Sequence, residues 1–180
     1  KHLINMNNIR LLLLDPRHKT RGLHNSYVPI NIGYIGEFVK AKIKNINLEL
    51  KLSTDTDEIF ELLKNWKPNV VAVSNYVWNA AFSNLICEYA KKINPNTLCI
   101  LGGPEFPSGT GITNFSNIVK KNCFNYLINK PCVDYHCYSD GETAFANVVK
   151  KYIESNFSTA LMRKNNIVVD GSMSLSHDKQ

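Results

Sequence analysis

The stretch that decides the fold is KPNVVAVSNY, residues 67–76. Residues 70–73 form an unbroken aliphatic run, which is bounded by Pro68-Asn69 on one side and by Ser74-Asn75 on the other. Such a run is typical of a strand that is buried on both faces within a parallel sheet. We therefore predict a loop with polar side chains at the carboxyl end of this strand.

The same pattern continues in both directions along the chain. Short apolar runs predict further strands over residues 9–14, 48–52, 98–101 and 133–138. The segments between them carry apolar residues at helical spacing. This spacing predicts helices that begin after residue 29 and after residue 55, a helix that ends before residue 94, and helices over 112–127 and 145–153. Together these units predict an α/β fold: a doubly wound (Rossmann-like or flavodoxin-like) five-stranded parallel sheet with helices on both faces.

The last residues break this rhythm. Ala160–Arg163 and Ile167–Val169 resemble two short strands around a polar turn, which predicts a short C-terminal β-hairpin. The expected organisation is an N-terminal extension over 1–8, the α/β domain over 9–157, and a hairpin connector and linker over 158–180.

Composition narrows the class of protein. The chain has 180 residues, 44% of them hydrophobic and 20% charged, as expected of one globular domain. The net charge of +6 comes from the first 44 residues and no basic face with interleaved aromatics is evident, so we expect no nucleic-acid partner. No apolar stretch has membrane length, so no membrane partner is expected. Five cysteines without paired spacing predict reduced thiols and a cytoplasmic location.

Ligands of open parallel sheets bind at the carboxyl ends of the strands. This rule directs attention to the loops Asp15–Pro29, Ser74–Asn79, Gly102–Gly109 and Ser139–Glu142. The adjacent glycines Gly102 and Gly103 either let a ligand approach the backbone or serve an ordinary strand-to-helix turn.

Several familiar chemistries are not supported by motifs. The sequence has no G-x-G-x-x-G dinucleotide fingerprint and no phosphate-binding P-loop. Ser74 stands where a phosphoacceptor domain would need Asp, and no G-x-S-x-G surrounds it, so we interpret it as a polar group lining a pocket. Gly33 and Gly36 are better explained by close packing of the helix on the sheet or on a ligand than by phosphate binding. No catalytic residue is predicted in this chain.

Metal ligation receives little support from the residues. We interpret Cys132 and Cys137 as core thiols and His136 as a surface histidine. The reason is that His136 and Cys137 are neighbours on a predicted strand, so their side chains point to opposite faces of the sheet. In the first loop, His18 and His24 are either solvated or in contact with a bound cofactor, as a metal ligand or a polar group.

Taken in order, these loops resemble the N-terminal cobalamin-binding domain of cobalamin-dependent radical SAM enzymes. The resemblance covers residues 8–155 and rests on motifs whose order and spacing match: Pro29–Ile35, Lys67–Ser74, Tyr76–Asn79, Asn94-Pro95, Leu101–Glu105, Val133–Tyr135 and Asp140–Glu142.

The resemblance implies a corrinoid carrier within a larger enzyme. In that family, methylcobalamin is an intermediate methyl donor while a SAM-derived radical activates the substrate. The implied cobalamin-binding residues are Asp15, Asn31, Ser74, Asn75, Tyr76, Trp78, Gly102, Gly103, Glu105, Gly141 and Glu142. The nucleotide tail of the cofactor is expected beside Ser74 and the glycines, and Tyr76 and Trp78 are expected against the corrin ring or a partner domain.

The sequence also departs from its relatives. Cobalamin domains of the methyltransferase and mutase class carry D-x-H-x-x-G in the first loop, with the histidine on cobalt, whereas residues 15–22 read DPRHKTRG. Of these residues, His18 alone could ligate cobalt, and the radical SAM class generally lacks that ligand. A C-x3-C-x2-C cluster motif is absent, so the 4Fe–4S cluster and S-adenosylmethionine are expected in a C-terminal radical SAM domain of the same polypeptide, beyond Gln180. The alternatives are a Rossmann-like interaction domain without cobalamin and a small nucleotide-binding enzyme.

Overall fold

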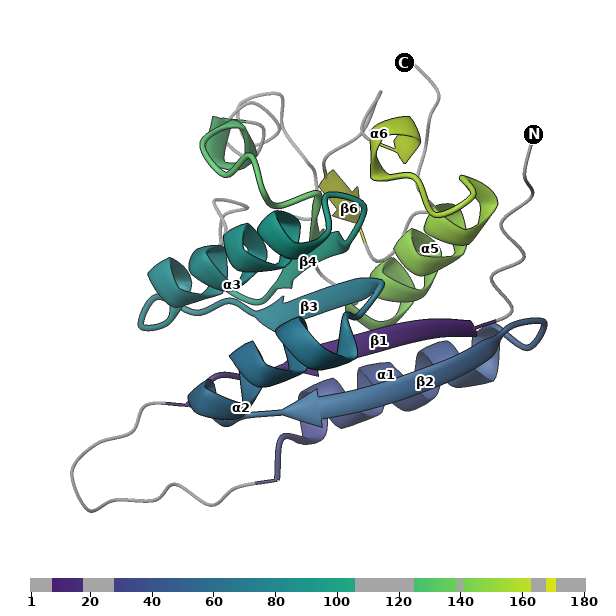
Figure 1. Cartoon of the computed structure of the whole chain (residues 1–180), viewed down its shortest axis with the longest axis horizontal. Coiled ribbons are helices and arrows are strands. Elements are labelled where there is room, and N and C mark those ends of the chain that lie inside the picture. Colours follow the sequence, from purple (N-terminus) through teal and green to yellow (C-terminus); the bar gives the residue numbers. More distant parts are fainter. Residues whose placement is uncertain (1–7, 18–27, 106–124, 139–140, 163–167, 171–180) are drawn as a thin grey trace.

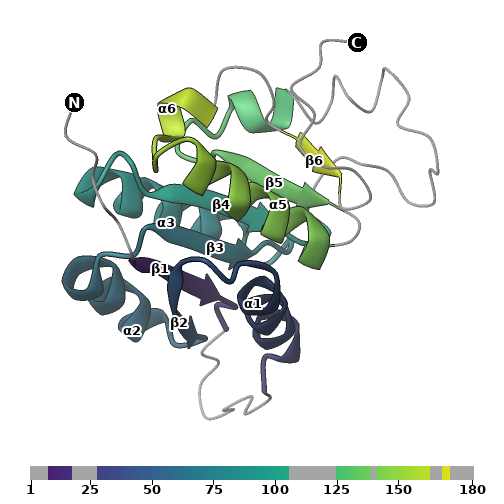
Figure 2. The same ribbon diagram turned by 90° about the vertical axis from the view of Figure 1, so that its right-hand side faces the viewer.

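Six parallel strands form one sheet in the order β2-β1-β3-β4-β5-β6 (Figures 1 and 2). The computed structural model describes residues 8–17, 28–105, 125–138, 141–162 and 168–170. The strands are β1 (Asn8–Leu14), β2 (Asn47–Ser53), β3 (Val70–Ser74), β4 (Leu98–Gly102), β5 (Tyr135–Tyr138) and β6 (Val168–Asp170). The first five strands are those predicted from the apolar runs.

Helices cover both faces of this sheet, which confirms the doubly wound prediction (Figure 2). On one face lie α1 (Ile30–Lys42) and α5 (Gly141–Glu154), which contact each other. On the other face lie α2 (Thr56–Glu61), its π-helical continuation η1 (Leu62–Trp66) and α3 (Ala80–Ile93). Residues 125–128 form a helical turn, and the rest of the helix predicted over 112–127 lies outside the described residues.

The alternation of side chains along β1 shows why its sequence is continuously apolar. Leu11 and Leu13 belong to the cluster under α1 and α5, whereas Leu12 and Leu14 belong to the cluster under α2 and α3. All four are at most 1% exposed. A strand between two helical layers has no solvent-facing side, so its sequence lacks the alternation of a half-exposed strand.

Local sequence signals explain how the first two helices begin and pack. Asp55 caps α2 by accepting a hydrogen bond from the Asp57 N–H at 2.8 Å, which satisfies a backbone donor in the first turn of the helix. Gly36 is buried in α1 at a point where a Cβ atom would lie 2.5 Å from a Leu50 methyl group. The glycine therefore lets α1 approach β2 closely, which confirms the packing interpretation for this position.

The predicted C-terminal hairpin is wrong. Residues 159–162 form α6 (Thr159–Met162), and β6 pairs in parallel with β5, so it cannot be the second arm of a hairpin. Tertiary contacts explain the helix: Met162 is 1% exposed, and its carbonyl accepts a hydrogen bond from the Tyr135 hydroxyl at 3.0 Å. Burial of one short helical turn outweighs the weak strand signal of its sequence.

The expectation of a surface histidine at position 136 is also wrong. His136 is fully buried, and its ring meets Tyr126 edge-on at a centroid distance of 6.3 Å. The physical reason is that the helical turn over 125–128 covers this face of β5, where Tyr126 packs against the His136 ring. Cys137 is buried, as expected of a core thiol.

Among the described residues, no helix combines the length and apolarity needed to cross a membrane.

Candidate functional site

A pocket of about 400 Å³ opens at the carboxyl ends of β3 and β4, on the side covered by α1 and α5. The strand order reverses next to the pocket, between β1 and β3, because β2 lies on one side of β1 and β3 on the other, and Leu13 of β1 also lines the pocket. This reversal is the position at which open α/β sheets bind their ligands. Six predicted site residues line the pocket: Asn31, Ser74, Tyr76, Gly102, Gly103 and Gly141.

The walls of the pocket are largely apolar, and sequence reasoning missed them. Leu13, Ala72 and Ile100 come from three neighbouring strands, and Ile35 and Phe145 come from α1 and α5. In the sequence these residues look like ordinary core positions. Whether such a side chain faces another side chain or a cavity depends on where the covering helices α1 and α5 end.

No charged side chain is among the described residues that line the pocket. Cys137 lines it too, and burial raises the pKa of its thiol to about 12, so the thiol is uncharged at neutral pH. A neutral pocket favours an apolar or aromatic group over a phosphate or carboxylate, because a buried charge needs a partner.

Two polar side chains offer hydrogen bonds within these walls. Ser74 ends β3 and Asn31 lies in the first turn of α1, with 3.5 Å between the Asn31 Nδ2 and the Ser74 Oγ. This distance is at the long limit for a hydrogen bond, so both groups keep capacity for a ligand. The assignment of Ser74 as a polar group lining a pocket is confirmed by its position.

The two adjacent glycines serve different purposes. Gly103 has φ +127°, and a Cβ atom there would lie 2.6 Å from the Asn75 carbonyl oxygen, so the turn itself requires glycine. A Cβ atom at Gly102 would meet nothing closer than the Cys137 carbonyl oxygen at 3.8 Å. The absent side chain of Gly102 therefore leaves room inside the pocket.

Asn75 and Glu105 fix the loops around the pocket instead of lining it. The buried Asn75 amide donates to the Glu105 carbonyl oxygen and to the Tyr126 hydroxyl oxygen, both at 2.9 Å. The Asn75 N–H donates to the Gly102 carbonyl at 2.6 Å. These bonds hold the loops after β3 and β4 against each other.

Asn79 is a positioning residue that the site prediction did not include. Its Oδ1 accepts from the Tyr76 N–H at 2.7 Å, and its Nδ2 donates to the Ser74 carbonyl at 2.9 Å. Both bonds fix the loop after β3. Its place just before the apolar face of α3 was the available signal, since Asn commonly occupies such helix-entry positions.

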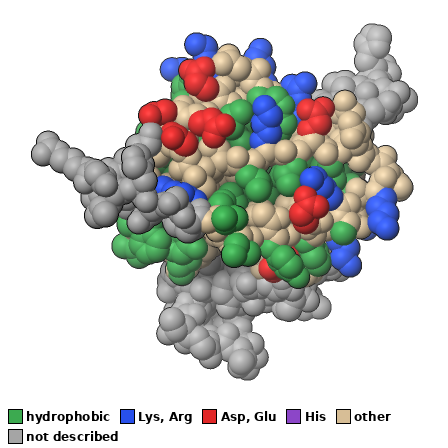
Figure 3. Space-filling model, turned by 90° about the horizontal axis from the view of Figure 1, so that it is seen from below, with side chains coloured by type: hydrophobic (Ala, Val, Ile, Leu, Met, Phe, Trp, Pro, Cys, Tyr) green, Lys and Arg blue, Asp and Glu red, His purple; other side chains and the backbone are tan. Residues whose placement is uncertain are grey.

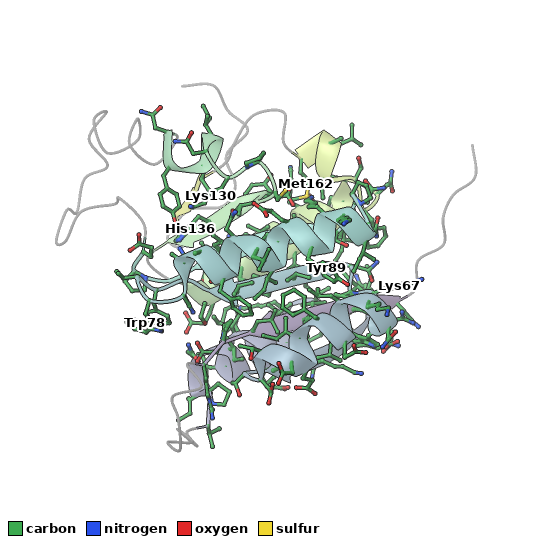
Figure 4. All side chains as sticks on the ribbon, turned by 60° about the vertical axis from the view of Figure 1, so that its left-hand side comes forward. Lys67, Trp78, Tyr89, Lys130, His136 and Met162 are labelled. Atoms are coloured by element: carbon green, nitrogen blue, oxygen red, sulfur yellow. The ribbon has the colours of Figure 1, made fainter. Side chains whose placement is uncertain are left out.

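An aromatic pair lies at the pocket. The rings of Tyr76 and Trp78 stack with a centroid distance of 4.4 Å and an interplanar angle of 8°. Trp78 is 60% exposed and Val77 is 77% exposed, so an apolar surface lies next to the pocket-lining Tyr76. Figure 4 shows Trp78 at the end of the molecule opposite Lys67, which precedes β3.

The remaining predicted residues lie elsewhere. Asp15 follows β1 and is 4% exposed, and Glu142 lies in the first turn of α5; neither lines the pocket. His18 lies outside the described residues, as do His24 and the first two residues of the Ser139–Glu142 loop. Within the described part of the chain, no group of three or more His, Cys, Asp or Glu residues could hold a metal ion.

Comparison with known proteins gives two curated relatives, and no protein-family model matches the chain. Over 83 residues the chain is 30% identical to the cobalamin-dependent radical SAM methyltransferase TokK of Streptomyces tokunonensis. The predicted resemblance is thereby confirmed. Over 82 residues it is 29% identical to the 2-(S-pantetheinyl)-carbapenam-3-carboxylate methyltransferase of Streptantibioticus cattleyicolor. Each match covers 46% of this chain and 10% of the relative.

Proposed function

We propose that this chain is the cobalamin-binding domain of a larger radical SAM methyltransferase. The observation that carries the proposal is the neutral pocket at the strand reversal, lined by Ser74 and Gly102. The similarity to a cobalamin-dependent radical SAM methyltransferase identifies the ligand class to test first. The radical SAM domain, with its 4Fe–4S cluster and S-adenosylmethionine, belongs to the same polypeptide in this proposal.

The pocket suits one end of cobalamin, the nucleotide tail with its aromatic base. Apolar walls match an aromatic group, and the missing side chain of Gly102 leaves space inside the pocket. Ser74 and Asn31 supply hydrogen bonds at the polar edge of the tail. Cobalamin, when bound, supplies a cobalt centre that carries a methyl group for transfer.

The residues of this chain bind and orient; none is assigned a catalytic role. Tyr76 lines the pocket with Trp78 stacked on it, so the pair offers a flat surface to the corrin ring or to the catalytic domain. The Asn75 and Asn79 hydrogen bonds keep the loop that carries this pair in place before any ligand arrives. Such preorganisation lowers the entropy lost on binding.

Reconstitution tests the proposal. The purified chain is incubated with hydroxocobalamin and desalted, and its visible spectrum is recorded. We expect retained corrin absorption for the wild type and its loss for Gly102→Val, which fills the pocket from a strand position that tolerates a β-branched residue. Ala81→Val, on the exposed surface of α3, is the matched control and retains the colour. A colourless wild type at saturating hydroxocobalamin contradicts the proposal.

The exposed Val77 and Trp78 favour a second candidate, an interaction domain of the same architecture that holds no cobalamin. This candidate predicts a colourless protein whose Trp78→Ala variant loses binding to the catalytic domain. The nucleotide-binding alternative predicts that ATP or NAD raises the melting temperature, since a ligand that binds only the native state stabilises it.

A further inference from the structure

The outer edge of β2 is open in the described part of the chain. β2 pairs with β1 on one side and stands first in the sheet order, and no described strand lies beyond it. A seven-residue edge strand presents backbone N–H and C=O groups that can pair with another strand. Figure 3 views the molecule from the side on which β2 lies, and shows hydrophobic, acidic and basic side chains there.

The side chains of β2 alternate between the two faces of the sheet. Leu48 and Leu50 pack against the cluster under α1, and Leu52 lies on the same face near Gly33. Glu49 and Lys51 occupy the other face, where Glu49 lies 3.6 Å from Arg10 and the Lys51 ammonium group lies 4.9 Å from the centroid of the Trp66 ring. Leu52 is 41% exposed and the Glu49 side chain 39% exposed, so both faces remain accessible at this edge.

The sequence Leu48-Glu49-Leu50-Lys51-Leu52 is self-complementary when it is read in opposite directions. In an antiparallel pair centred on Leu50, each Leu50 faces its copy, Leu48 faces Leu52, and Glu49 faces Lys51. Neighbouring registers with the same facing place Glu49 against Glu49 or Lys51 against Lys51, and like charges directly opposite each other are destabilising. A one-residue slip would set leucines opposite charged residues.

We propose that two copies of this chain associate through β2, in antiparallel register about Leu50, to form one continuous sheet. The two-fold axis passes through the Leu50 pair, so the interface buries the same surface of each copy. Charge complementarity indicates that the partner of this edge is a second copy of the chain. Each copy supplies a Glu49 carboxylate and a Lys51 ammonium group, and these face the Lys51 and Glu49 of the other copy. This proposal does not depend on cobalamin.

Charge exchange tests the register. Glu49→Lys alone and Lys51→Glu alone each place like charges opposite each other twice in the dimer, whereas the double variant Glu49→Lys/Lys51→Glu restores two opposite-charge pairs. Sedimentation velocity over a concentration series, without cobalamin, is expected to show a dimer for the wild type and the double variant. Each single variant is expected to be monomeric at the same concentrations, and an equimolar mixture of the two is expected to form a heterodimer.

The controls separate the interface from the fold. The double variant also loses the Arg10–Glu49 pair, so its recovery of the dimer could not come from contacts within one copy. Lys92→Glu makes the same charge change as Lys51→Glu on the exposed surface of α3 and is expected to leave the dimer intact. A wild type that stays monomeric at every concentration, or single variants that dimerise as the wild type does, would overturn the proposal.

Discussion

Gly102 and Gly103 are adjacent, and they are expected to respond differently to substitution. Gly103→Ala places a Cβ atom 2.6 Å from a backbone oxygen at φ +127°, so we expect the free energy of unfolding to fall by about 2 kcal/mol or more. Gly102→Ala meets only ordinary contacts and is expected to change it by less than about 1 kcal/mol. Urea unfolding of the two variants measures the difference. Equal losses would contradict this account of the turn.

His136 gives the protein a dependence on pH that does not involve the pocket. Burial lowers the pKa of this histidine to about 3, so between that value and its ordinary 6.5 the unfolded chain binds a proton that the folded chain does not. The free energy of unfolding therefore falls as the pH decreases through this range. Between about pH 7.5 and 5.5 we expect His136 to account for a loss of about 1.4 kcal/mol.

The variant His136→Phe isolates this contribution, because it keeps an aromatic ring beside Tyr126 and removes the titrating group. Urea unfolding at both pH values is expected to show a smaller pH dependence in the variant than in the wild type. If the two proteins lose stability equally, the histidine is not the source of the effect.

At the scale of elements, a buried ion pair connects α3 to the start of β5. The Lys91 Nζ lies 2.7 Å from Asp134 Oδ2, which also accepts a hydrogen bond from the Cys99 N–H at 2.8 Å. The Asp134 side chain is fully buried and that of Lys91 is 12% exposed. Removing one partner of such a pair leaves a buried charge without its counter-ion.

We expect Lys91→Met to lower the free energy of unfolding by about 3 kcal/mol. The double variant Lys91→Met/Asp134→Asn is expected to recover part of this loss, because the buried charge is gone and the amide oxygen introduced at position 134 can still accept from the Cys99 N–H. A double-mutant cycle by urea unfolding measures the coupling. The expectation is wrong if the double variant is no more stable than Lys91→Met.

The sequence predicted elements whose signals are local and missed those that depend on distant contacts. The aliphatic runs at β1, β3 and β4 are long enough to identify buried strands. Thr159–Met162 is too short for any pattern to decide, and its helix depends on contacts such as the Tyr135–Met162 hydrogen bond across the core. The burial of His136 likewise depends on a tertiary contact, the packing of Tyr126 against its ring, which no local pattern around position 136 reveals.

At the scale of the whole molecule, the position of the pocket was predictable and its composition was not. Residues 74, 76, 102, 103 and 141 lie in loops that follow from the rule that the carboxyl ends of parallel strands meet at one edge, whereas Asn31 was implied by the family resemblance. Asn75 and Glu105 lie on the same loops as the lining residues, but they hydrogen-bond to each other and so join the loop after β3 to the loop after β4. No local sequence rule predicts whether a loop residue lines the pocket or makes such a bond. The apolar wall residues could not be predicted from the sequence, because the wall of an apolar pocket and the protein core contain the same residue types.

The central claim is that this pocket holds the nucleotide tail of cobalamin. Equilibrium dialysis of the chain against hydroxocobalamin and against cobinamide, the corrinoid that lacks the nucleotide tail, tests it most directly. We predict measurable binding of hydroxocobalamin, weakened by Gly102→Val, and much weaker binding of cobinamide. Equal binding of the two corrinoids, or no binding of either, would contradict the claim.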